Sequence, residues 1–412
     1  MDILLPLTAV LVTAITLALI CAKLRIPSVI GYIMAGFLLN IPVFKSFIVA
    51  HNGIAQINFL GELGIIFLLF ITGLEINLFK LRASKKEETL IALFSTIFSF
   101  FLGFLLMKLL GFNNITAFIV GATMSVTAEG TNAAVLMELN KLKTKIGTII
   151  LGSGILDDFF EVFFFSILIG MVHISIGSAE AMRELQLLPV KIGLFIVLIA
   201  VIAKIVLPFM IKFTKKEHTN LSTLSFVIIF FFLIASLSSF FGLGPVIGAF
   251  IAGVIVQRML NDKTKRKKII KEMNDFSYAF IIPFFFVKIG LNLNLNVLFN
   301  NFPFFLLILI VGVIGKLFGT LLVKPFTKLS VLQLYVIGWG MNSRGAMELV
   351  IAELARANGL ISTEIYSVLV LMAIITTFMF PFVIKYYVKR YPRITEDSPE
   401  GASPDKKLLP AV

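Results

Sequence analysis

Two long stretches of this chain, Thr219 to Gln257 and Ile289 to Gly315, contain no Asp, Glu, Lys or Arg. Both are longer than the roughly 20 apolar residues that a helix needs to cross the hydrocarbon core of a bilayer. Because hydrocarbon offers no hydrogen-bond partners, every backbone N–H and C=O must be paired within the protein, and a helix does so within one segment. Charged residues make up 14% of the chain, about half of the usual share. The sequence therefore predicts an all-α polytopic membrane protein.

The apolar segments alternate with short polar or basic stretches and predict about thirteen membrane-spanning helices. They belong to one transmembrane domain over about residues 1–391, and the polar residues 392–412 are expected to form a short disordered tail. The expected helices lie at about 3–22, 27–41, 56–79, 89–110, 114–137, 146–172, 187–212, 221–241, 244–260, 273–299, 303–325, 331–354 and 362–388.

The Lys and Arg residues gather in alternate loops between these helices. By count, 27 of the 36 lie in one set of loops and in the tail, and 5 lie in the opposite set. Because cytoplasmic loops carry the excess of Lys and Arg, the C-terminus is expected in the cytoplasm and, with an odd number of spans, the N-terminus outside. The net charge of +13 thus reflects membrane topology, and we expect no nucleic-acid partner.

Three groups of residues recur at a constant spacing of 217 positions. This shift carries the second expected helix onto the ninth, the third onto the tenth and the fifth onto the twelfth. An odd number of spans separates the partners, so the two halves are expected to be inverted relative to each other, as in many secondary transporters. The alternative is that small residues recur because they let membrane helices approach closely. The matched groups are Val29-Ile30-Gly31 with Val246-Ile247-Gly248, residues 73–78 with 290–295, and Gly121 and Met124 with Gly338 and Met341.

Two adjacent carboxylates, Asp157 and Asp158, lie near the middle of the sixth expected helix, and Glu161 follows one turn later. An ionisable residue at bilayer depth costs roughly 2.5–3.5 kcal/mol and usually marks an ion path or a buried pair. Neighbours on a helix project about 100° apart, so one Asp can face a cavity while the other faces a partner. Two carboxyl groups this close can exchange protons near neutral pH. The pattern predicts a site for a cation and protons.

Lys316 lies inside the eleventh expected helix, between Gly315 and Gly319. The glycines allow close contact between helices, and a buried ammonium group requires an anion. We expect Asp157 to be the partner of Lys316.

The fifth and twelfth expected helices contain polar, Gly-containing stretches at 123–132 and 338–345, where apolar residues are expected. Unwound segments at these places leave helix ends near the bilayer midplane, and charged side chains can neutralise the dipoles of those ends. We expect Glu129 and Arg344 to do so, with Glu348 close by. The alternative for Arg344 is a local pair with Glu348, four residues later.

Four motifs together resemble the second family of monovalent cation:proton antiporters, in particular its NapA- and GerN-like sodium/proton branch. They are GATMSVTAEGTN at 121–132, GILDD at 154–158, GKLFG at 315–319 and MNSRGAMELV at 341–350. The resemblance implies two inverted-topology repeats with broken crossing helices, and a homodimer in the inner membrane of a bacterium. It also implies panel helices at about 3–79 and 221–299, core helices at about 89–172 and 303–388, and a linker helix at about 187–212.

The resemblance implies roles for the site residues as well. Asp158 is expected to carry the cation and the proton, Asp157 to pair with Lys316 until a cation arrives, and Thr127 to supply a neutral oxygen ligand. The transported Na⁺ or Li⁺ is the only metal implied, at Asp158 and Asp157, and no cofactor is expected. Two carboxylates resemble the electrogenic class of these antiporters, which work by alternating access and serve pH homeostasis.

Other functions stay open at this point. K⁺/H⁺ exchange is the second transport function. An intramembrane aspartyl protease needs two carboxyl groups that converge on one water molecule, whereas neighbours on one helix diverge. A cation channel conducts continuously, and a titratable pair with a lysine partner suits exchange better. We therefore expect a transporter and not an enzyme.

Overall fold

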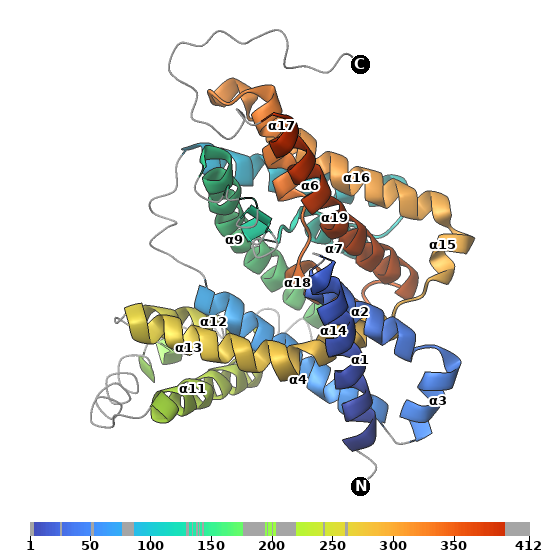
Figure 1. Ribbon diagram of the computed structural model, residues 1–412, viewed down its shortest axis with the longest axis vertical. Helices are drawn as coiled ribbons and strands as arrows, with labels where there is room; N and C mark the ends of the chain where they lie inside the picture. The colour runs from blue at the N-terminus through green and yellow to red at the C-terminus, as the bar shows by residue number, and fades with distance from the viewer. Residues whose placement is uncertain are drawn as a thin grey trace. The chain divides into compact units, whose positions relative to one another are not determined.

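In the residues that the computed structural model describes, every regular secondary-structure element is a helix (Figure 1). Within this part, six helices are long and apolar enough to cross a membrane, and five shorter apolar helices accompany them. The expected linker helix at 187–212 lies mostly outside the described residues, and the tail at 392–412 lies wholly outside them. The described residues are 4–24, 27–50, 53–75, 86–128, 132–133, 135–136, 139, 141, 144–175, 194–195, 197–199, 201–202, 220–241, 244–259 and 263–391.

The chain divides into two compact units. The first unit comprises residues 1–76 and 169–293, and the second comprises 77–168 and 294–412. The first unit holds α1 (Leu4–Lys23), α2 (Ser28–Leu39), α3 (Pro42–Ala50), α4 (Gly53–Glu75), α11 (Asn220–Phe240), α12 (Pro245–Met259), α13 (Lys263–Phe276), the π-helical turn η1 (Ser277–Ile281) and α14 (Ile282–Leu291). The second holds α6 (Lys86–Leu109), α7 (Asn114–Ser125), most of α9 (Lys145–Ser175), α15 (Asn296–Asn300), α16 (Phe302–Leu321), η2 (Lys324–Phe326), α17 (Val331–Met341), α18 (Ala346–Ala357) and α19 (Thr363–Arg390).

Glycines bring the helices of the first unit into close contact. Helix α2 packs on α14, and α4 packs on α12. A Cβ atom at Gly36 would collide with the backbone of α14 beside Gly290, and one at Gly73 would collide with the backbone of α12 beside Gly253. Gly36 and Gly253 are 217 positions apart, as are Gly73 and Gly290. The two crossings therefore use equivalent residues with the partners exchanged.

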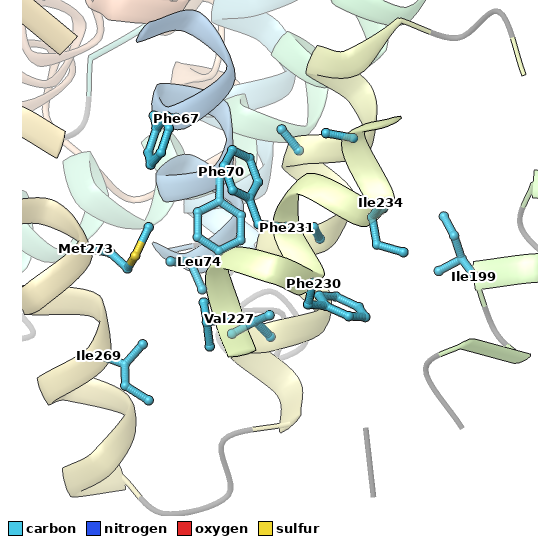
Figure 2. Close-up of a cluster of buried hydrophobic side chains, with 14 of the residues drawn as sticks. Phe67, Phe70, Leu74, Ile199, Val227, Phe230, Phe231, Ile234, Ile269 and Met273 are labelled. Atoms are coloured by element: carbon cyan, nitrogen blue, oxygen red, sulfur yellow. The ribbon is translucent and has the colours of Figure 1, made fainter. Parts of the chain in front are cut away.

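An aromatic cluster fills the space beside the crossing of α4 and α12. Phe67 and Phe70 of α4 meet Phe231 of α11, with ring centroids 5.0 and 4.5 Å apart (Figure 2). Ile269 and Met273 of α13 contribute to the same buried cluster. Phenylalanines and aliphatic side chains thus pack together in a buried core of this unit.

The second unit contains the two predicted helix interruptions. Helix α7 ends at Ser125, and Val126 continues in an extended conformation. Helix α17 ends at Met341, and α18 begins at Ala346. Their outer ends are capped by side chains: Asn113 accepts a hydrogen bond at the start of α7, and Ser330 does so at the start of α17. Each helix therefore begins at a good N-cap and ends within the polar stretch.

Helix bounds repeat with the same spacing as the sequence motifs. The first residues of α2 and α12, and those of α7 and α17, are 217 positions apart. The shift therefore relates whole helices as well as the short motifs that revealed it.

Within the described ranges, two segments differ clearly from the expected helices. The tenth expected helix, at 273–299, begins earlier, at Lys263, contains the π-helical turn η1 and ends at Leu291. Pro283 follows this turn and lacks the N–H that would continue an α-helical ladder, which explains the wider turn before it. The short helix α3 was not expected, and Pro42 at its first position favours a new helix start after α2.

Candidate functional site

Three acidic residues of α9 lie close together along one helix. Asp157 and Glu161 are buried, and Asp158 is half-buried. Asp157 and Glu161 are four residues apart and so lie on one face, whereas Asp158 projects about 100° away from Asp157. The two aspartates therefore have different surroundings, as their adjacency in the sequence predicts.

Asp157 forms a buried ion pair with Lys316 of α16. The Nζ atom of Lys316 lies 2.9 Å from Oδ2 of Asp157, and both side chains are inaccessible to solvent. The other carboxylate oxygen, Oδ1, accepts a hydrogen bond from the hydroxyl of Thr96 in α6. The two opposite charges therefore compensate each other. An unpaired charge in this buried position would be strongly destabilising.

Thr96 was missed by the sequence analysis. It belongs to a short run of buried hydroxyl residues in the otherwise apolar helix α6, together with Ser95 and Ser99. Hydroxyl residues one turn apart on an apolar helix indicate buried polar contacts. Their partners lie on distant segments of the chain, so the sequence of α6 alone does not identify them.

Thr127, in the interruption after α7, forms hydrogen bonds with residues of two other helices. The backbone N–H of Thr127 donates to Oε1 of Glu161 in α9, with the two atoms 3.3 Å apart. Its hydroxyl donates to the carbonyl oxygen of Met341, the last residue of α17, at 3.0 Å. Thr127 is buried. The predicted neutral ligand therefore lies between the carboxylate helix and the end of α17.

The two interrupted segments also bind each other. The N–H of Ala128 donates to the carbonyl oxygen of Ser343 at 2.8 Å. The hydroxyl of Ser343 lies 3.0 Å from the carbonyl oxygen of Ala128 and 2.8 Å from Oδ1 of Asn132. Backbone groups that the helices leave unpaired thus find partners in the opposite interruption, as buried peptide groups require.

Arg344 lies with its guanidinium at the end of α7. Its buried guanidinium donates to the carbonyl oxygens of Thr123, Met124 and Val126, and also to that of Gly312 in α16. The carbonyls of Thr123 and Met124 belong to the last turn of α7, at the negative end of the helix dipole, where a cation is stabilising. The structure therefore brings the Arg344 guanidinium to this helix end.

Glu348 lies one turn beyond Arg344 on α18. Its Oε2 atom is 3.8 Å from Nε of Arg344, and both residues are buried. The local pair that was considered as an alternative thus exists together with the contacts to α7. The remaining predicted compensating residue, Glu129, lies outside the described residues.

Among the described residues, no group of three or more His, Cys, Asp and Glu side chains is arranged to hold a metal ion. The site instead combines single carboxylates, hydroxyls and carbonyl oxygens near two buried cationic side chains. Such oxygen ligands suit a weakly held monovalent cation that can enter and leave.

Comparison with known proteins identifies a family model that matches residues 9–390 and is described as "Sodium/hydrogen exchanger, transmembrane". A Na(+)/H(+) antiporter of Enterococcus hirae is 29% identical over 372 residues, which cover 90% of this chain and 94% of that protein. The Na(+)/H(+)-K(+) antiporter GerN of Bacillus cereus is 27% identical over 364 residues, which cover 88% of this chain and 90% of that protein.

A similar fold is found in the sodium proton antiporter MjNhaP1 from Methanocaldococcus jannaschii. The TM-score is 0.64 at 17% sequence identity, and the match covers 94% of this chain and 98% of that one. The agreement in fold extends over nearly all of both chains.

Proposed function

Because this chain belongs to the sodium/hydrogen exchanger family of membrane transporters, we propose that it exchanges Na⁺ for protons at the carboxylates of α9. The observation that carries the proposal is the buried pair of Asp157 and Lys316 beside the half-buried Asp158, at the crossing of two interrupted helices. Asp157 is paired with the ammonium of Lys316 and keeps this partner until a cation arrives. Asp158 faces different surroundings and is the group that takes up the cation or the proton.

Asp158 binds either a proton or Na⁺ in this mechanism. A carboxylate that has lost its proton attracts the cation, and a protonated one does not, so the two substrates compete for one group. Transport then consists of loading Asp158 with Na⁺ on one side of the membrane and with a proton on the other. Li⁺ is expected to substitute for Na⁺ because it is also a small cation that prefers oxygen ligands.

Asp157 and Lys316 act as the switch beside this group. When Na⁺ arrives, Asp157 turns from the lysine toward the cation, and the ammonium of Lys316 can release a proton from its buried position. Two carboxylates and one lysine around one Na⁺ allow more than one proton to be exchanged for each cation, so we propose that transport is electrogenic.

Thr127 supplies a neutral oxygen to the cation. A hydroxyl has one hydrogen and two lone pairs. The hydrogen of Thr127 is donated to the Met341 carbonyl, so lone pairs are left to face a cation. Arg344, Glu348 and Glu129 compensate the helix ends around this ligand and do not carry the substrate.

Alternating access is the proposed route of transport, with the second unit as the moving core and the first unit as the panel. The proposal is supported by the division of the chain at 76–77, 168–169 and 293–294, near the boundaries between the expected panel and core helices. It is also supported by the glycine crossings and helix starts that recur at a spacing of 217, since inverted repeats underlie such motions.

We further propose that the protein is a homodimer in the inner membrane of a bacterium, with its C-terminus in the cytoplasm, and that it serves pH homeostasis. The excess of Lys and Arg in alternate loops supports this orientation.

K⁺/H⁺ exchange is the second candidate, because the name of the relative GerN includes K⁺ as well as Na⁺. Proteoliposomes with an internal pH dye distinguish the two. Addition of Na⁺, Li⁺ or K⁺ in turn, with and without an imposed membrane potential, is expected to give proton movement with Na⁺ and Li⁺. A response to K⁺ alone would favour the second candidate, and a response to none of the three would refute both.

A further inference from the structure

We propose that Glu161 is a positioning residue of the cation site, which holds Thr127 in place through a hydrogen bond to its backbone N–H. The inference rests on the proposed function, because it concerns how Thr127 comes to serve as a cation ligand. Glu161 is 2% exposed and lies in α9, one turn beyond Asp157. Its Oε1 atom accepts the N–H of Thr127 at 3.3 Å.

A buried carboxylate at the position of Glu161 lowers the stability of the protein, so we expect it to have a function there. Burial of a charged group is unfavourable without a partner, and the charged groups that act on Glu161 are Asp157, Asp158 and Lys316. Two of these three repel it, and Lys316 is already bound to Asp157. Within the described part of the chain, Glu161 forms no ion pair, and its hydrogen bond is to the Thr127 backbone.

Thr127 is fixed by two hydrogen bonds of different kinds. Its hydroxyl is directed by the carbonyl oxygen of Met341, which no side-chain substitution removes. Its backbone N–H is bound by the carboxylate of Glu161, a side-chain group that a substitution can remove. Val126 and Ala128 on either side stay bound to Arg344 and Ser343, so loss of the Glu161 bond releases only the peptide group of Thr127. That peptide can then tilt, and the hydroxyl oxygen no longer stays at one distance from the acids of α9.

The second half of the chain contains the same kind of anchor. Arg344 is 217 positions after Thr127, and its backbone N–H donates to the hydroxyl of Thr377 in α19 at 3.3 Å. Thr377 lies one residue before the position equivalent to Glu161. A neutral hydroxyl thus does in one half what the carboxylate does in the other. The hydrogen bond, and not the negative charge, is therefore the shared requirement.

This distinction predicts a specific order among variants. Glu161→Gln keeps an acceptor oxygen at the same reach and should preserve the anchor. Glu161→Ala removes the acceptor, and Glu161→Asp keeps the charge but shortens the side chain by one methylene. We expect the apparent KM for Na⁺ to rise about tenfold in the Ala variant, as the loss of one hydrogen bond implies, and to rise in the Asp variant too. The Gln variant should stay within about threefold of the unaltered protein.

The maximal rate separates positioning from a role in carrying substrate. Asp158 is intact in all three variants, so exchange at saturating Na⁺ should stay close to that of the unaltered protein. Ser153→Ala is the matched control, because Ser153 is a buried polar residue of α9 whose hydroxyl donates to the carbonyl of Glu88 and not to the interrupted segment. Its KM for Na⁺ should not change.

The experiment measures Na⁺-driven proton movement in proteoliposomes for the unaltered protein and these four variants, together with the rise in melting temperature on Na⁺ addition. A raised KM in both Ala and Asp variants with near-normal KM in Gln supports the anchor. An unchanged KM in Ala and Asp, or a Gln variant as impaired as Ala, overturns it. If the Glu161→Ala protein does not fold, the KM values of the Glu161→Asp and Glu161→Gln variants test the anchor by themselves. If the unaltered protein does not exchange Na⁺, the proposed function fails and the anchor fails with it.

Discussion

Thr127 and Arg344, which are 217 positions apart, each donate a hydrogen bond to the helix end that precedes the other residue. The hydroxyl of Thr127 donates to the carbonyl oxygen of Met341, and the guanidinium of Arg344 donates to that of Met124. Met124 and Met341 are also 217 positions apart. The contacts are equivalent, but one donor is neutral and the other is permanently charged. The end of α7 is thus bound by a permanent cation, whereas the end of α17 is bound by a neutral hydroxyl.

Replacement of Arg344 by Lys should destabilise the protein, although the positive charge is kept. The guanidinium reaches two carbonyls of α7, that of Val126 just after α7, and one of α16, whereas an ammonium has three donors on a narrower group. We expect a loss of about 2–3 kcal/mol for the unmet carbonyls, measured as a lower melting temperature in detergent. Arg356→Lys is the control, because Arg356 is partly exposed and binds Glu353. Equal melting temperatures for the two variants would contradict the role given to Arg344.

Replacement of Lys316 by Met should weaken the cation-free protein. The carboxylate of Asp157 would lose its partner at 2.9 Å in a site without solvent, and breaking a buried pair in this way costs about 3–5 kcal/mol. The melting temperature should therefore fall, and Na⁺ should raise it more than in the unaltered protein, because the cation can take the place of the ammonium.

The matched control for that prediction is the double variant Asp157→Asn with Lys316→Met. Removal of both charges leaves no uncompensated group, so stability should recover in part. A double variant less stable than Lys316→Met alone would show that the two residues do not form the pair described.

The apparent KM for Na⁺ should fall as cytoplasmic pH rises. Protonated Asp158 cannot bind Na⁺, so at low pH more Na⁺ is needed to displace the proton, and at high pH less is needed. For one competing proton, the change is at most about tenfold for each pH unit. Exchange rates measured at several pH values over a range of Na⁺ concentrations test this, and a KM independent of pH would exclude competition at one carboxylate.

The glycine crossings of α2 with α14 and of α4 with α12 should respond alike to substitution. Gly36→Leu and Gly253→Leu each place a side chain against the backbone of the facing helix, which overpacking makes unfavourable by about 1–3 kcal/mol or more. Met34→Leu is the control on α2, because Met34 is exposed. A large loss of stability at one glycine only would show that the two crossings are not equivalent.

Much of this architecture could be predicted from the sequence because charges stand out among apolar residues. The long uncharged runs indicate helices, and Lys316, which directly follows such a run in the middle of an expected helix, requires an acid. The positions of the interruptions were visible as polar stretches around Thr127 and Arg344, since apolar helices rarely contain Gly beside several polar residues.

Other features leave no such signal in the sequence. The carbonyls that bind Arg344 belong to the backbone, so residue types do not reveal them. Glu161 was noticed as a third acid, but its partner is the N–H of Thr127, which any residue except proline would offer there. The π-helical turn before Pro283 lies within an apolar segment and does not alter its hydropathy.

The proposed exchange depends most on Asp158 as the group that carries both cation and proton. Its most direct test is Na⁺-driven proton movement in proteoliposomes that contain the Asp158→Asn variant, with melting temperature as the check on folding. Asparagine has a similar shape but cannot bind a proton or hold the charge that attracts Na⁺. We predict a folded protein with no Na⁺/H⁺ exchange. Exchange at a rate near that of the unaltered protein would contradict the central claim.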